Sequence, residues 1–143
     1  MPTKNYLLDA CALLAYLKDE RGAEIVENLI EQARCREITL IMNAANLIEV
    51  YYDRIRESGS ELANAIIREI YNASPIIIIE TLTRDIVQEA AILKSTGKMS
   101  FADSILVATA KCTNAIIVTC DHVELAHIEQ QGVLPFLWIR PQF

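Results

Sequence analysis

The chain has 143 residues, 52% of them hydrophobic, and a formal net charge of −6. This length suits one domain (residues 1–143) with a core that needs no disulfide or structural metal, and no apolar run approaches the roughly 18–20 residues that span a bilayer. The charge argues against a broad basic nucleic-acid surface, although clustered acids neutralised by a metal ion remain compatible with it.

Strand patterns alternate with helical patterns along the whole chain. Short apolar and β-branched runs predict strands at residues 6–8, 37–42, 76–79, 115–119 and 134–139. Amphipathic or apolar segments predict helices at 10–17, 21–36, 44–57, 61–72, 84–95, 100–113 and 122–131. The strands read as continuous apolar runs, which is typical of buried parallel strands. We therefore predict an α/β fold with a mainly parallel central sheet of about five strands.

The cysteines and histidines carry little catalytic signal. None of the cysteines is part of a C-x-x-C pair and only two histidines exist, so neither a zinc site nor a disulfide framework is expected. Cys112 and Cys120 are interpreted as small core residues. Cys11 has no evident base, and no glycine-rich phosphate loop occurs, so nucleophilic catalysis and nucleotide binding are not favoured.

Asp9 stands where an apolar strand gives way at once to an apolar helix. In open α/β sheets, ligands bind in the crevice beyond the carboxyl ends of the strands. Asp9 is therefore expected on the floor of such a crevice, and the other acids are judged by whether they reach it.

Asp103 is the second candidate, because its neighbours on the helix at 100–113 are apolar. A carboxylate in such a setting is costly unless it is paired or binds a metal. Ser100 and Asp103 also fit a helix-capping pattern, which is the alternative interpretation. Asp121 follows the strand at 115–119 and allows the same two interpretations. Glu49 lies in a polar helix stripe that ordinarily faces solvent, but its like-charged neighbour Asp53, four residues on, suggests a nearby cation.

With these acids in order, the sequence resembles the PIN-domain ribonucleases, and most closely the VapC toxins of toxin–antitoxin pairs. The resemblance rests on Leu7-Leu-Asp-Ala-Cys11, Asn46-Leu-Ile-Glu-Val50, the segment from Phe101 to Ala110, and Ile117-Val-Thr-Cys-Asp121. It departs from the family at Cys11, where Ser or Thr is usual. It also departs after Asp121, where His-Val-Glu-Leu replaces the usual basic or acidic residue followed by Asp-Phe.

The resemblance implies an α/β/α sandwich in which Asp9, Glu49, Asp103 and Asp121 converge as the catalytic, metal-binding acids. Oxygen ligands of this kind suit Mg²⁺ or Mn²⁺. The implied reaction is hydrolysis of an RNA phosphodiester by water. Asp9 and Asp103 would be the main ligands, while Thr119 would orient Asp121 if one metal suffices, and Cys11 would stand beside the site.

The resemblance also implies a homodimer and a cognate antitoxin as partners, besides the RNA substrate. The first residues run directly into the first predicted strand and leave no room for a signal peptide, so a cytoplasmic protein is expected. The helices at 44–57 and 61–72 offer a groove with Tyr51, Tyr52 and Tyr71, although at least two of these tyrosines are expected to pack in the core. Basic residues that would steer phosphate, among them Arg140, are too scattered to assign.

Two other function classes stay open at this point. A non-catalytic, for example antitoxin-binding, module would use the acids only as helix caps, and it would bind no metal. A metal-dependent phosphotransfer or phosphatase domain would use Asp9 as a nucleophile, but such domains usually carry an acid where this chain has Cys11.

Overall fold

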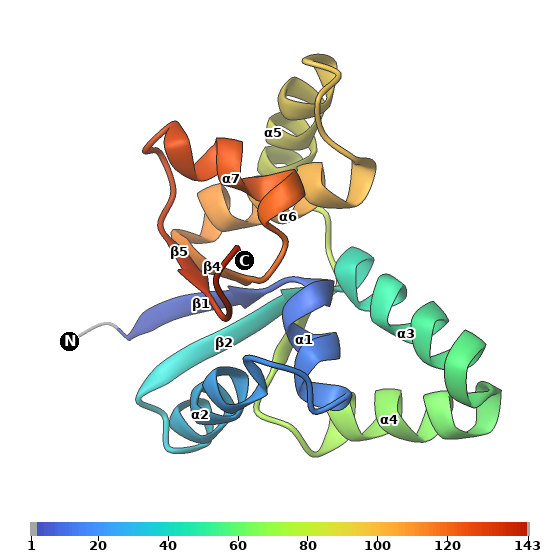
Figure 1. The fold of residues 1–143 in the computed structure, drawn as a ribbon. Helices are drawn as coiled ribbons and strands as arrows, with labels where there is room; N and C mark the ends of the chain where they lie inside the picture. Colours follow the sequence, from blue (N-terminus) through green and yellow to red (C-terminus); the bar gives the residue numbers. More distant parts are fainter. Residues whose placement is uncertain (1–2, 143) are drawn as a thin grey trace.

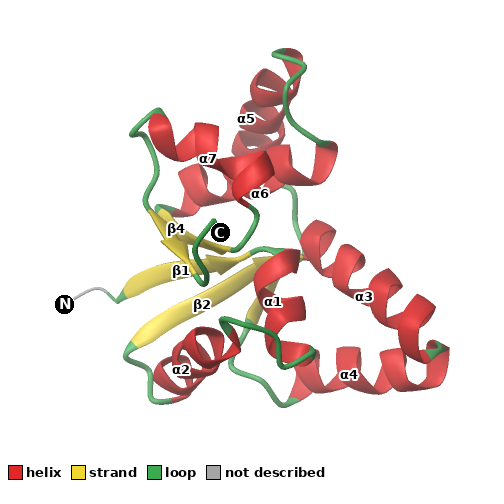
Figure 2. Cartoon of the chain, viewed as in Figure 1, coloured by secondary structure: helices red, strands yellow, loops and turns green. Residues whose placement is uncertain are grey.

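The chain forms a five-stranded sheet, all of it parallel, with helices on both faces (Figures 1 and 2). The computed structural model describes residues 3–142. The strands are β1 (Lys4–Leu8), β2 (Ile38–Asn43), β3 (Ile77–Ile79), β4 (Ala115–Thr119) and β5 (Phe136–Trp138). The helices are α1 (Ala10–Leu17), α2 (Ala23–Arg34), α3 (Ala44–Ser58), α4 (Ser60–Asn72), α5 (Arg84–Ser95), α6 (Phe101–Thr113) and α7 (His122–Gln130). The predicted α/β class and parallel sheet are confirmed.

Alternation of the strand side chains divides the core into two layers. Leu8 and Val118 point into the cluster formed with α1, α2, α3 and α4. Leu7 and Ile117 point to the opposite face, where they pack against α6 and α7. Helix α5 lies outside this second layer, against α6 (Figure 1). Because both faces are covered, most strand positions are apolar, and the polar ones stand mainly at strand ends.

The order of the strands, β3-β2-β1-β4-β5, places a change of direction beside β1. The chain first moves outward from β1 to β2 and β3, and it then returns to lay β4 on the other side of β1. Leu8 is in register with Val118, so the carboxyl ends of β1 and β4 lie side by side. This is the place where open α/β sheets bind ligands.

Helix α3 differs from its prediction in which face is buried. Asn46 lies one turn before Glu49 on the polar stripe that was expected to face solvent, yet it is only 2% exposed, whereas the apolar Ile48 is 63% exposed. Asn46 is buried because its side-chain amide donates to the carbonyl of Ala102 on α6, 3.3 Å away. A contact between two helices thus decided the orientation, and the local pattern does not contain it.

The tyrosines of α3 and α4 also differ from expectation. Only Tyr51 packs against the core, and its hydroxyl hydrogen-bonds Asn64. Tyr52 and Tyr71 are 49% and 44% exposed. The expectation that at least two of the three would be buried is therefore wrong, because α3 and α4 turn these rings outward.

No helix within residues 3–142 combines the length and the apolarity that crossing a bilayer requires.

Candidate active site

Asp9 is a nearly buried carboxylate at the junction of β1 and α1. It caps α1: its Oδ1 accepts from the Ala12 amide at 2.8 Å, which fixes one oxygen. Its other oxygen accepts from the hydroxyl of Thr119, the last residue of β4. With 5% of its surface exposed, Asp9 is held from both strands that flank the change of direction.

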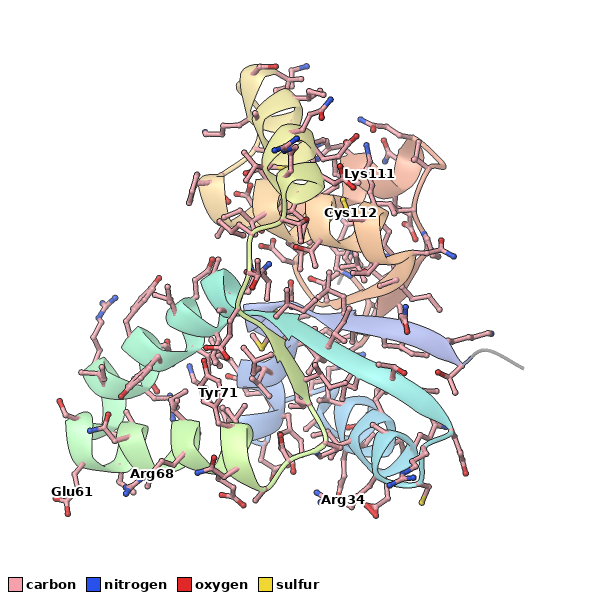
Figure 3. All side chains as sticks on the ribbon, turned by 180° about the vertical axis from the view of Figure 1, so that it is seen from behind. Arg34, Glu61, Arg68, Tyr71, Lys111 and Cys112 are labelled. Carbon is pink, nitrogen blue, oxygen red and sulfur yellow. A yellow bond between two sulfur atoms is a disulfide. The ribbon has the colours of Figure 1, made fainter. Side chains whose placement is uncertain are left out.

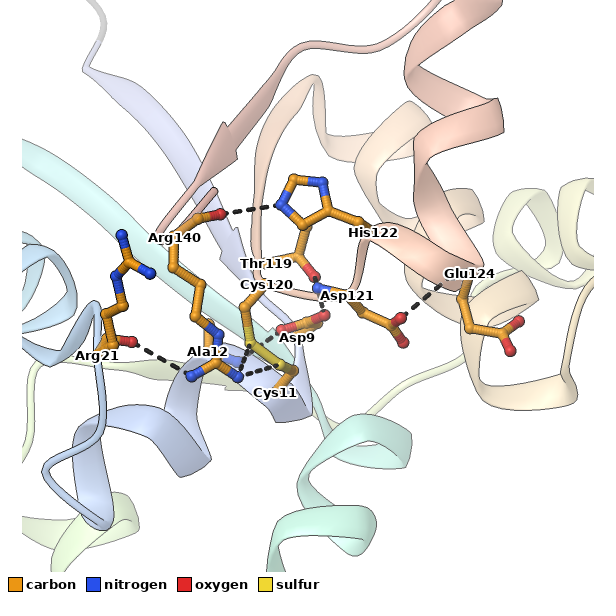
Figure 4. The surroundings of a disulfide bond; sticks show 10 residues. All are labelled: Asp9, Cys11, Ala12, Arg21, Thr119, Cys120, Asp121, His122, Glu124 and Arg140. Atoms are coloured by element: carbon orange, nitrogen blue, oxygen red, sulfur yellow. Dashed lines mark hydrogen bonds between the residues drawn. A yellow bond between two sulfur atoms is a disulfide. The ribbon is translucent and has the colours of Figure 1, made fainter. Parts of the chain in front are cut away.

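Thr119 joins Asp9 to Asp121. Its Oγ1 donates to Asp9 and accepts from the Asp121 amide at 2.9 Å (Figure 4). Asp121 in turn caps α7, where its Oδ1 accepts from the Glu124 amide at 3.2 Å. The two aspartates therefore have helix-capping roles and also share one hydroxyl between them.

The charges of Asp103 and Asp121 act on the other two sequence-predicted acids, Asp9 and Glu49. Burial raises the pKa of Asp9 to about 7, although bonds from Thr119 and Ala12 oppose the shift; the charges of Asp103 and Asp121 add to it. Burial raises the pKa of Glu49, and the same two charges raise it further. Mutual repulsion of this kind arises where carboxylates face a common space.

Asp103 lies in the first turn of α6, and Ser100, not Asp103, caps that helix by accepting from the Asp103 amide at 3.1 Å. Burial raises the pKa of the Asp103 carboxyl, and Asp121 and Glu124 contribute repulsion, against the opposing effects of Ser100 and His127. Glu124 and His127 were not singled out from the sequence. Their positions three and six residues after Asp121, on the helix it caps, are the signal that could have found them.

The donor set suits a hard divalent cation, although no ready-made ligand cage exists. Within residues 3–142, no three His, Cys, Asp or Glu side chains stand close enough to hold a metal ion between them. Mg²⁺ does not require such a cage, because it keeps several waters and binds through one or two carboxylates. Asp9, Glu49 and Asp103, which burial desolvates and the charges of neighbouring acids repel, therefore fit Mg²⁺ or Mn²⁺.

Asp53, in contrast, lies outside this group. Its carboxylate pairs with Lys18 at 3.2 Å and with Arg54 at 3.0 Å. Burial opposes ionisation of Asp53, but the bonds from Arg54 and Lys18 outweigh it and lower its pKa. The cation suggested by the like-charged pair Glu49 and Asp53 is thus supplied at Asp53 by side chains. Glu80, which also directly follows a strand, is exposed, and its charge acts on Tyr71.

Cys11 and Cys120 form a disulfide beside Asp9, which corrects the expectation that the chain has none (Figure 4). Cys120 lies in the core as predicted, but it is bonded and not a free thiol. The two cysteines are 109 residues apart, and pairing of β1 with β4 brings them together. Local spacing carries no information about such a contact.

Cys112 was expected in the core, but it is exposed on α6 beside Lys111 (Figure 3). The helix buries its other residues from Ser104 to Ala110, and by Cys112 it has run past the edge of the packed layer. Cys35 is exposed as well. Of the four cysteines, the two beside the acids are therefore the bonded pair.

The metal-free protein is expected to lose stability as pH rises from about 4 to 7. In this window the unfolded chain has released the Asp9 proton, whereas the folded chain still holds it, because the folded-state pKa is about 7 against 3.8. The decrease is at most about 4 kcal/mol, since each pKa unit is worth about 1.4 kcal/mol. Urea unfolding in chelator at pH 5 and pH 8 measures it, and equal stabilities would show that Asp9 ionises normally.

The chain matches a known protein family and resembles several solved structures. A PIN domain family model matches residues 6–129. VapBC-1 from nontypeable Haemophilus influenzae superimposes with a TM-score of 0.70 at 17% identity, covering 94% of this chain and 98% of that chain. A toxin–antitoxin complex from Klebsiella pneumoniae gives 0.69 at 16%, with the same coverages of 94% and 98%.

VapC20 of Mycobacterium tuberculosis, a toxin that cleaves the sarcin–ricin loop, gives a TM-score of 0.59 at 16% identity. The superposition covers 85% of this chain and 94% of that one. At such identities the likeness concerns the fold. No curated protein sequence matches the chain significantly.

Proposed function

Because the chain belongs to the PIN domain family, we propose that it is a divalent-metal-dependent endoribonuclease, the toxin of a toxin–antitoxin pair. The observation that carries the proposal is the Thr119 hydroxyl that links Asp9 to Asp121 at the adjoining carboxyl ends of β1 and β4. The charges of Asp103 and Asp121, which act on both Asp9 and Glu49, support it. The non-catalytic alternative, in which the acids only cap helices, leaves two features unexplained. Glu49 lies inside α3 and caps no helix. A capping role also does not require Asp9 to be buried with its pKa raised to about 7.

In the proposed reaction, Asp9 and Asp103 would be the main holders of Mg²⁺ or Mn²⁺, and Glu49 and Asp121 would complete the site. When bound, the ion supplies a Lewis acid for the phosphoryl oxygen and lowers the pKa of water. Thr119 fixes one oxygen of Asp9 and the backbone of Asp121, so neither acid has to reorganise during the reaction. Asp9 must release its proton to the solvent before it can act as a ligand.

The contacts of Asp9 do not favour the phosphotransfer alternative. Both of its oxygens accept hydrogen bonds, from the Ala12 amide and the Thr119 hydroxyl, and the position two residues on, where such domains usually carry an acid, is the disulfide-bonded Cys11. The disulfide likewise leaves Cys11 with no thiol to act as a nucleophile.

The partners proposed with this function are RNA, a cognate antitoxin and a second copy of the chain, in the cytoplasm. The similar structures from Klebsiella pneumoniae and Haemophilus influenzae are toxin–antitoxin assemblies, which supports the antitoxin. An apolar surface for it exists on α3 and α4. Its exposed residues are Ile48, Tyr52, Ile55 and Leu62.

Calorimetric titration of Mn²⁺ into the wild type and Asp103→Asn tests the proposal without any assumption about the RNA. We expect binding to the wild type with release of about one proton at pH 6, because Asp9 is protonated there. Titrations in two buffers of different ionisation enthalpy measure that proton. Asp103→Asn should bind at least about 10-fold more weakly, since removing even an outer partner of a metal site costs 10–100-fold.

Asp85→Asn is the matched control for this titration. Asp85 is exposed in the first turn of α5, and its charge acts on Cys112 of α6. Cys112 is nine residues from Asp103 on the same helix, so the two lie about 14 Å apart at a rise of 1.5 Å per residue. This variant should bind Mn²⁺ as the wild type does. Equal affinity in Asp103→Asn and Asp85→Asn would remove Asp103 from the site.

A further inference from the structure

Arg140 follows β5 and is anchored at the edge of the acid site. The preceding residue, Ile139, donates its amide to the carbonyl of Thr119 at 3.0 Å. The carbonyl of Arg140 lies 2.9 Å from Nε2 of His122, whose ring stacks on Trp138 with the ring centres 4.0 Å apart. These contacts fix the Arg140 backbone to the end of β4 and the start of α7, the two elements that present Thr119 and Asp121.

The guanidinium of Arg140 lies against the disulfide (Figure 4). Its NH2 group is 3.3 Å from the sulfur of Cys120 and 3.9 Å from that of Cys11, and its NH1 group donates to the carbonyl of Arg21 at 3.3 Å. Cys11 is two residues beyond Asp9, and Cys120 stands between Thr119 and Asp121. Arg140 therefore contacts two residues that neighbour Asp9 and Asp121 in the sequence, and these contacts place its charge at the border of the acid group.

The ion pairs within residues 3–142 involve the basic residues Lys18, Arg34, Arg54 and Lys111, and none of them joins Arg140 to a carboxylate. The partners of Arg140 are a carbonyl and two sulfur atoms, and bonded sulfur is only a weak acceptor. Arg21, which supplies that carbonyl, is exposed and carries the same charge. Two adjoining arginines that form no ion pair with a carboxylate within residues 3–142 favour an anion between or beside them.

We propose that Arg140 binds a backbone phosphate of single-stranded RNA and thereby sets the position of the strand relative to Asp9. The inference rests on the proposed nuclease function and deepens it. A guanidinium binds phosphate through two parallel hydrogen bonds, which fixes orientation as well as charge. Arg140 compensates for the repulsion that four acids exert on an incoming polyanion. It is a substrate-binding residue and takes no part in the transfer of protons.

The test compares Arg140→Gln, Arg140→Lys and the control Arg36→Gln for binding of a fluorescein-labelled single-stranded RNA of mixed sequence. Arg36 is exposed just before β2, at the amino ends of the parallel strands, whereas the acids lie at their carboxyl ends. Its substitution by Gln removes the same charge as Arg140→Gln does. Fluorescence anisotropy is measured in Ca²⁺, a hard cation for carboxylate sites, over a series of KCl concentrations. Urea midpoints of all three variants show whether each is folded.

Arg140→Gln should weaken binding about 10- to 100-fold, the range expected for a lost charge-assisted bond, and it should lower the salt slope by about 0.7. Arg140→Lys should restore the slope but only part of the affinity, because it keeps the charge and loses the paired geometry. Arg36→Gln should resemble the wild type in both quantities. A purely structural role would leave the salt slope unchanged in every variant.

Wild-type affinity and slope in Arg140→Gln would overturn this inference. If Asp103→Asn loses Mn²⁺ binding in the same preparations, the nuclease proposal survives that result. If the wild type binds neither Mn²⁺ nor RNA, the proposed function fails and the role of Arg140 fails with it.

Discussion

Asp9→Asn is expected to abolish RNA cleavage and, in the absence of metal, to make the protein more stable at pH 8. Cleavage should fall at least about 10²-fold, because the amide cannot replace a charged metal ligand. Stability should rise by about 1–4 kcal/mol, since the variant no longer holds a buried charge whose pKa is raised to about 7. Asn is also a good helix cap, so α1 should start as before.

The two effects of Asp9→Asn are measured by cleavage of a single-stranded RNA pool with Mn²⁺ and by urea unfolding in chelator. Asp85→Asn, which removes an exposed charge, should change neither quantity appreciably. Retained cleavage would remove Asp9 from the catalytic group. Unchanged stability at pH 8 would show that the Asp9 carboxylate is not penalised by burial, and the coupling argument would then lose its main support.

Loss of the Cys11–Cys120 disulfide should be the largest single change in stability outside the core. The bond closes a loop of 109 residues, for which chain entropy predicts about 4–5 kcal/mol, and measured losses are commonly 2–4 kcal/mol. Urea unfolding with and without a phosphine reductant should show this difference in the wild type. The double variant Cys11→Ser with Cys120→Ser should be as unstable as the reduced wild type, and reductant should not affect it.

Alkylation of the denatured protein tests the disulfide directly. Without reductant, two of the four cysteines should react, Cys35 and Cys112, and with reductant all four should react. Reaction of all four without reductant would contradict the disulfide and would predict no effect of reductant on unfolding. Persistence of this bond in the proposed cytoplasmic setting would be unusual, because thiols there are generally kept reduced.

The elements were predictable because each carries its own local signal. Asn43 ends β2 and caps α3, as its type suggests, and its side chain accepts from the Ala45 amide at 2.9 Å. The strands at the centre of the sheet are continuous apolar runs, so their parallel, buried setting followed from composition. The ends of the helices were predicted less accurately. The pattern predicted a helix from residue 21, but α2 starts at Ala23, because Gly22 before it has a positive φ of +97°.

Asp9 and Asp121 were predicted as site residues because they follow strands, and Asp103 because its neighbours are apolar; their catalytic role stays a prediction. The link from Asp9 through Thr119 to Asp121 could not be foreseen, since it depends on the register of β1 against β4. The same register joins Cys11 to Cys120, a contact that residue spacing cannot show. Arg140 is the clearest case, because only the packing of the segment after β5 gives a scattered basic residue a definite place.

The stacking of His122 on Trp138 gives the protein an optical probe at the edge of its acid site. Trp138 is the only tryptophan, so all indole emission comes from this position. The His122 ring that covers it also bonds the Arg140 carbonyl. A displacement of the segment that carries Arg140 will therefore alter the surroundings of one fluorophore. Intrinsic emission during mixing with RNA can follow such a displacement in real time, without a label and before any bond is cut.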